Sequence, residues 1–313
     1  MQNFTDKFID KLELRGIKAK VISVEHMEEI KSDIEKMRSD YNDVRDNLGV
    51  YFDKFKFNGQ KEGFEAKSII VVAVPQPIVK IHFTADNKKF TAVIPPTYLL
   101  NTSADESKQP KIAEVTSVLN NILSENNYKA AKVNLPCKLL AVRSGLGEYG
   151  KNNVCYINAG SSFYWIGSYI SDMPCETDSF REKTVMDKCY DCNLCLTGCP
   201  SGAIGSDRFI VHAGRCITLY NESTDEFPEW IDPSWHNSII GCMRCQLICP
   251  ANRDSLNNIE ELADFNVIET DLILKGTPIE DLPETTYSKL QKINFVEDYA
   301  LLARNAGMLV NKQ

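Results

Sequence analysis

The spacing of hydrophobic residues predicts alternating helices and strands in the first part of the chain. Apolar runs of strand length, rich in β-branched and aromatic residues, occupy residues 68–77 and 162–170. Two more apolar segments flank Asp86 and Asn87, a pair that is typical of a tight antiparallel hairpin. We expect helices at residues 2–15, 26–48, 110–125 and 136–144, and further strands at 18–24, 128–133 and 153–159.

The pattern changes after residue 185 and again after residue 253. Residues 254–284 contain nine acidic residues and one lysine, so we expect an acidic connector there. Residues 296–310 place Tyr299, Leu302, Ala303 and Ala306 on one face of a helix. We therefore predict three parts: a mixed α/β (α+β) domain at 1–185, a cysteine-rich domain at 186–253, and a connector with a short C-terminal helix at 254–313.

Composition places the chain among ordinary globular proteins. It has 313 residues, of which 43% are hydrophobic and 25% charged, and this excludes a disordered or fibrous chain. There is no apolar run of 18 residues and no basic segment leading into an apolar one, so we expect no membrane insertion and a cytoplasmic protein. The formal net charge of −8 neither indicates nor excludes binding to nucleic acid.

Cysteines give the strongest chemical signal. Eight of the eleven lie between Cys189 and Cys249, and the first four have the C-x2-C-x2-C-x3-C-P spacing of bacterial ferredoxins that hold two 4Fe-4S clusters. A second, shorter motif follows, and one cysteine stands between the two motifs. The eight residues are Cys189, Cys192, Cys195, Cys199, Cys216, Cys242, Cys245 and Cys249.

Crossed pairing of two-cluster ferredoxins predicts which cysteines share a cluster. In that arrangement the fourth cysteine of a motif binds the cluster of the other motif. One cluster then takes Cys189, Cys192, Cys195 and Cys249, and the other takes Cys199, Cys216, Cys242 and Cys245. Two zinc sites are the alternative, but zinc needs neither the third cysteine of the first motif nor the Cys-Pro endings. We expect Cys137, Cys155 and Cys175 to be buried and not to bind metal.

Together these segments resemble the epoxyqueuosine reductases, iron-sulfur and cobalamin enzymes of queuosine biosynthesis in tRNA, to which reductive dehalogenases are related. The resemblance rests on Leu140–Asn152 (LAVRSGLGEYGKN), Gly160–Gly167 (GSSFYWIG), Cys189–Ile204, Arg215–Thr218 and Gly241–Arg253. It implies a nitroreductase-like cobalamin domain followed by a ferredoxin-like double-cluster domain. It also implies that a base-off corrinoid contacts Ser144, Gly145, Gly147, Gly150, Lys151 and Ser162, although taken alone the GLGxxGK stretch is more typical of a structural turn than of a cofactor site.

The resemblance implies electron transfer from ferredoxin or flavodoxin through both clusters to the corrinoid. The family's catalytic aspartate is not matched, because Ala131 or Asn134 stands in its place. Tyr98 and Tyr149 are candidate replacement proton donors. The substrate is then either epoxyqueuosine in tRNA or an unidentified small molecule. The alternatives are an electron-transfer or corrinoid-reactivating protein without its own small substrate, and a sensor or scaffold with structural clusters.

Overall fold

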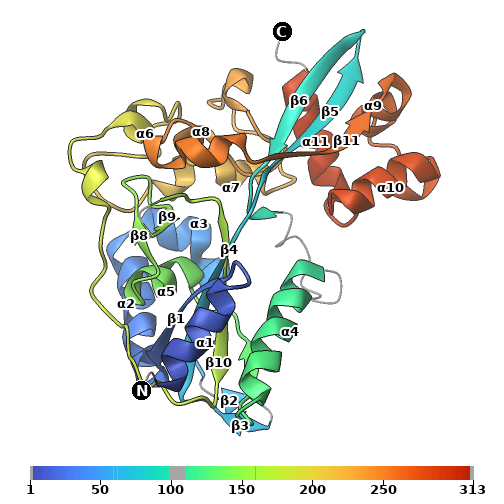
Figure 1. The fold of residues 1–313 in the computed structure, drawn as a ribbon. Helices are drawn as coiled ribbons and strands as arrows, with labels where there is room; N and C mark the ends of the chain where they lie inside the picture. Colours follow the sequence, from blue (N-terminus) through green and yellow to red (C-terminus); the bar gives the residue numbers. More distant parts are fainter. Residues whose placement is uncertain (1–2, 59, 62, 99–109, 159, 311–313) are drawn as a thin grey trace. The chain divides into compact units, whose positions relative to one another are not determined.

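The computed structural model describes residues 3–58, 60–61, 63–98, 110–158 and 160–310, which divide into two compact units (Figure 1). Unit 1 comprises Met1–Pro75 and Asp105–Asn193, and unit 2 comprises Gln76–Ala104 and Leu194–Gln313. The predicted hairpin around Asp86 thus groups with the C-terminal part of the chain, whereas the sequence pattern placed it with the first 185 residues. No helix within the described residues is both long and apolar enough to cross a membrane.

An antiparallel sheet forms the centre of unit 1. Its strand order is β1 (Lys18–Ser23), β4 (Ser68–Pro75), β10 (Tyr164–Ser171) and β7 (Ala130–Lys132). Ile69, Val71 and Ala73 of β4 join one core with residues of α2 (Met27–Asp40) and α5 (Cys137–Arg143). Alternate residues of β4 point to the other face, on whose side Figure 1 shows α1 (Phe4–Glu13) and α4 (Pro110–Ser124). Helices therefore cover both faces of this sheet.

One helix expected from the sequence is interrupted. The predicted helix at 26–48 is α2 and a separate α3 (Asn42–Phe52), with Tyr41 between them in an extended conformation. Asp40, Asn42 and Asp43 surround this break, and such residues favour caps and turns over helix interiors because their side chains compete for backbone hydrogen bonds. The other predicted helices of unit 1 are confirmed within a few residues at each end.

The sheet of unit 2 joins strands that are distant in sequence. The predicted hairpin is confirmed as β5 (Ile78–Ala85) and β6 (Lys88–Ile94), with positive φ angles of 48° at Asp86 and 60° at Asn87 in the turn. On its other edge, β5 pairs in parallel with β11 (Ile259–Phe265).

The acidic segment therefore does not form the expected connector. It supplies β11 and α9 (Val267–Leu274), which a capping box of Asn266 and Glu269 begins. Glu260, Glu261 and Asp264 of β11 are exposed, whereas Ala263 and Phe265 are buried. A half-buried strand keeps its carboxylates on the solvent side, so a high acidic content is compatible with a place in the core.

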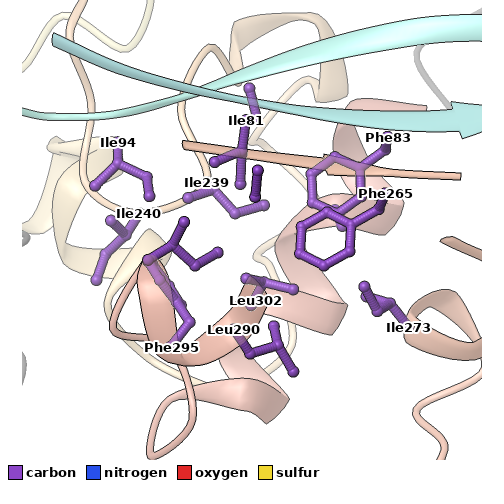
Figure 2. Close-up of a cluster of buried hydrophobic side chains, with 14 of the residues drawn as sticks. Ile81, Phe83, Ile94, Ile239, Ile240, Phe265, Ile273, Leu290, Phe295 and Leu302 are labelled. Atoms are coloured by element: carbon purple, nitrogen blue, oxygen red, sulfur yellow. The ribbon is translucent and has the colours of Figure 1, made fainter. Parts of the chain in front are cut away.

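A second hydrophobic core lies beneath this sheet (Figure 2). Phe83 of β5 stacks on Phe265 of β11 with ring centroids 5.2 Å apart. Helices α10 (Glu284–Lys292) and α11 (Tyr299–Val310) close the core with Leu290 and Leu302. The predicted apolar face of the terminal helix is confirmed, since Tyr299, Leu302 and Ala306 are buried and Ala303 packs against the cluster.

Candidate functional site

The first two motif cysteines lie at the end of unit 1. Cys189 ends the 3-10 turn η4 (Asp187–Cys189), and the backbone N–H of Cys192 donates to the carbonyl oxygen of Cys189 at 3.3 Å. Both cysteines are partly exposed. The loop around them is therefore folded locally by its own backbone hydrogen bonds.

The remaining six motif cysteines lie in unit 2, on or beside short helices. Cys195 is buried on α6 (Leu194–Thr197), and Cys245 lies on α8 (Arg244–Leu247), which packs against α6. A Cβ on Gly198 would lie 2.9 Å from the Leu194 carbonyl oxygen and 3.1 Å from the Ile248 side chain. Glycine at this position thus allows the helices of the two motifs to approach closely.

Three cysteines predicted to share a cluster are electrostatic neighbours. Burial raises the pKa of the Cys216 thiol, and nearby Cys199 raises it further. Burial likewise raises the pKa of Cys242 to about 11, with Cys216 and Cys199 as further causes. Within the described residues, no three ligand-type side chains converge as they would around a single ion. A four-iron cluster carries its own sulfide and takes its cysteines at four separate corners.

A buried polar network connects α11 to the loops of Cys216 and Cys242. The amide of Asn305 donates to the carbonyl oxygens of Asn221 at 3.0 Å and Ile239 at 2.7 Å. Asn221, which ends α7 (Ile217–Asn221), donates in turn to the Gly241 carbonyl oxygen at 2.7 Å. Both asparagine side chains are buried. Neither residue was singled out from the sequence alone, and only Asn305 has a local signal, as part of the polar pair Arg304-Asn305 inside an apolar helix.

Replacing Asn305 with alanine is expected to loosen these loops. The change leaves two buried carbonyl oxygens without this donor, at a cost of about 1–3 kcal/mol each. We expect a lower melting temperature and less iron per chain after reconstitution. Gly307 on the same helix provides the control, because an added Cβ there meets nothing within 4 Å and alanine favours helix over glycine by about 1 kcal/mol. An Asn305→Ala protein as stable as Gly307→Ala would contradict this role.

The pKa values of both candidate tyrosines are raised. The Tyr98 hydroxyl donates to Glu222, and burial, then the Glu222 charge, raises the pKa of Tyr98 well above its ordinary value. Tyr98 also lies against Gly241, where a Cβ would be 2.7 Å from its hydroxyl. Burial similarly raises the pKa of Tyr149. A raised pKa favours the neutral phenol and makes each tyrosine a weaker proton donor.

The glycine-rich turn follows α5 and forms a hairpin of β8 (Gly147–Tyr149) and β9 (Cys155–Ile157). A Cβ on Gly147 would lie 2.8 Å from the Tyr156 carbonyl oxygen, and one on Gly150 would lie 2.5 Å from the Tyr156 ring. Gly145 has a φ of +74°. Packing within the protein therefore accounts for Gly147 and Gly150, and the positive φ accounts for Gly145, as in a structural turn.

The three polar residues predicted to contact a corrinoid also contact other parts of this chain. Ser144 caps the end of α5, and its hydroxyl donates to the Ala141 carbonyl oxygen at 3.2 Å. Ser162 is buried just before β10. Lys151 donates to the carbonyl oxygen of Cys192 at 2.9 Å. The corrinoid contacts of these residues remain a prediction.

Neither residue aligned with the family's aspartate carries a carboxylic acid. Ala131 is within β7, opposite Ile170 of β10. The side-chain amide of Asn134 donates to the Lys54 carbonyl oxygen at 3.0 Å, and the Asn134 carbonyl oxygen accepts from the Lys56 amide at 2.9 Å. Asn134 thus holds the chain after α3 and supplies no carboxylic acid.

Comparison with known proteins identifies the double-cluster region and its relatives. The family model of the 4Fe-4S double cluster binding domain matches residues 188–252. An epoxyqueuosine reductase from Escherichia coli is 39% identical over 128 residues, which are 41% of this chain and 32% of that protein. One from Cellulophaga algicola is 31% identical over 175 residues, 55% of each chain. The matched region thus spans from about a third to about half of these curated relatives.

Solved structures extend the similarity to nearly the whole fold. Epoxyqueuosine reductase from Streptococcus thermophilus aligns with a TM-score of 0.63 and 18% identity, over 99% of this chain and 81% of that one. A structure of epoxyqueuosine reductase with a modified tRNA stem loop aligns with a TM-score of 0.60 and 17% identity, over 98% and 80%. The chain is therefore related in sequence to the epoxyqueuosine reductases and has their fold, with a 4Fe-4S double-cluster domain.

Proposed function

We propose that the protein is an iron-sulfur oxidoreductase of the epoxyqueuosine reductase type, with two 4Fe-4S clusters that carry electrons to a site in unit 1. The observation that carries this proposal is the set of eight motif cysteines inside the matched double-cluster region, three of them electrostatic neighbours in unit 2. One cluster takes Cys189, Cys192, Cys195 and Cys249, and the other takes Cys199, Cys216, Cys242 and Cys245. Cluster thiolates require reducing conditions, which favour the cytoplasm.

The proposed substrate is epoxyqueuosine in tRNA, with an unidentified small molecule as the other possibility. Removing an epoxide oxygen as water consumes two electrons and two protons, and ferredoxin or flavodoxin is the proposed electron source. The resemblance implies a cobalamin as the electron acceptor in unit 1, which would supply low-potential metal chemistry when bound. The residues of this chain hold the clusters, and the proton donor is not assigned to Tyr98 or Tyr149.

A second candidate is an electron carrier that reduces the cofactor of another protein. It is favoured because neither position aligned with the family's aspartate carries a carboxylic acid. Ala131 lies in a strand, and the side chain of Asn134 donates a hydrogen bond to a backbone carbonyl oxygen. Such a carrier needs no proton donor of its own. Exposed carboxylates of β11, including Glu260 and Glu261, would offer it a docking surface whose affinity depends on salt.

Anaerobic reconstitution with iron, sulfide and cobalamin tests these proposals. After desalting we expect about eight irons per chain, as two 4Fe-4S clusters require. Retained corrinoid, followed by conversion of epoxyqueuosine tRNA with reduced flavodoxin, would support the reductase. Eight irons without corrinoid and without turnover would favour the carrier. A chain that binds two zinc ions and no iron would refute both.

A further inference from the structure

Lys151 lies beside the first cysteine motif because two segments of unit 1 run side by side. The Tyr149 amide donates to the Thr184 carbonyl oxygen, and the Met186 amide donates to the Tyr149 carbonyl oxygen, both at 2.9 Å. β8 is thereby joined to the segment that leads into Cys189. The glycine-rich turn that follows β8 is held next to this motif.

From that turn, the Lys151 ammonium reaches three oxygen atoms of the cysteine loop. It donates to the carbonyl oxygen of Cys192 at 2.9 Å, to the side-chain oxygen of Asn193 at 2.9 Å and to the carbonyl oxygen of Tyr190 at 3.4 Å. An ammonium has three N–H donors, so these bonds use all of them. All three acceptors are neutral, and charge-assisted bonds of this kind are stronger than neutral ones.

The position of this charge has an electrostatic consequence. Cys192 is a predicted ligand, and the ammonium is bonded to the carbonyl oxygen of that same residue. Reduction of a 4Fe-4S cluster adds one negative charge, and a nearby cation stabilises the reduced form. Net charge and hydrogen bonding around a cluster are among the factors that set its potential.

We infer that Lys151 is a positioning residue for the cluster of the first motif, and that it fixes the Tyr190–Asn193 loop and raises the reduction potential of that cluster. This inference rests on the proposed function, since it needs the cluster to be bound. It assigns to Lys151 a role toward iron and sulfur, in addition to or in place of the corrinoid contact that the family resemblance implies.

The test is an EPR-monitored redox titration of reconstituted Lys151→Met, Lys151→Arg and wild-type proteins. Methionine keeps most of the side-chain length and removes the charge, whereas arginine keeps the charge. Lys67→Met is the matched control, because Lys67 is an exposed lysine of the same unit. The titration is repeated in a Cys216→Ala background, where the remaining signal comes from the cluster of the first motif.

We expect Lys151→Met to lower the potential of this cluster and leave the other cluster unchanged. At a fixed potential the ratio of reduced to oxidised cluster should fall about tenfold, which corresponds to about 59 mV for one electron. Lys151→Arg should retain most of the wild-type potential, and Lys67→Met should match wild type. Loss of four irons in Lys151→Met with retention in Lys151→Arg would also support positioning.

An unchanged potential in a fully loaded Lys151→Met protein would overturn the inference, as would equal shifts of both clusters. Failure of the proposed function looks different. In that case the wild-type protein itself would take up no iron, or would take up eight irons without binding corrinoid and without turnover, whatever residue stands at position 151.

Discussion

Cys216→Ala is expected to remove one cluster and leave the other. Iron should fall from about eight to about four per chain, because each 4Fe-4S cluster needs its four cysteines. Cys216 lies between the two motifs in sequence, and the structure places it near Cys199 and Cys242. Iron and sulfide analysis with EPR of the reduced protein measures the loss.

The matched control for this variant is Cys137→Ala. The Cys137 sulfur lies in unit 1, 3.5 Å from the hydroxyl of Ser168, and is predicted not to bind metal. Its iron content should equal that of the wild type. Equal iron loss in both variants would refute the division of the eight cysteines, and full iron retention in Cys216→Ala would remove Cys216 from the ligand set.

Arg143→Met is expected to cause the largest loss of stability in unit 1. Arg143 is buried at the end of α5, and its guanidinium pairs with Glu29, with Asp33 at 3.2 Å and with Glu182 at 3.3 Å. It also lies 4.5 Å from the Phe180 ring centroid. Arg143 therefore joins α5 to α2 and to the segment that leads toward the first cysteine motif.

We expect a cost of about 3 kcal/mol, the lower end of the range for breaking a buried ion pair. Glu29 and Glu182 are exposed enough to regain water, and Asp33 keeps Lys183 at 2.7 Å. Hydrogen exchange of the β4 amides is the appropriate measurement, because a chain with two units need not unfold in one step. Arg38→Met, which breaks a surface pair with Asp53, should cost at most about 1 kcal/mol. Equal effects of the two variants would contradict the role of Arg143.

Local signals in the sequence were sufficient to predict an element or a motif where one segment contained all the relevant information. The hairpin turn at Asp86 and Asn87 was predicted because both residues tolerate positive φ. The apolar run that became β4 is buried on both faces and has little polar content. The cysteine motif was identifiable because ligand spacing is itself a property of sequence, and the 4Fe-4S family model matches it.

Long-range contacts decided the features that the sequence left open. β11 was hidden in an acidic segment because its pairing partner, β5, is about 180 residues earlier. Asn305 acquires its role only when α11 packs beside the loops of Cys216 and Cys242. The partners of Lys151 likewise depend on the alignment of β8 with residues 184–186.

The sequence by itself determined most local elements, the relationship to epoxyqueuosine reductases and the eight candidate ligands, because short-range conformational preferences and ligand spacing are written in contiguous residues. Tertiary structure alone decided the composition of the two units, the place of the acidic segment in a core and the contacts of Tyr98 and Lys151. These features depend on which segments, distant in the sequence, pack together and exclude water. Their burial then determines the hydrogen bonds and the pKa values of the enclosed groups.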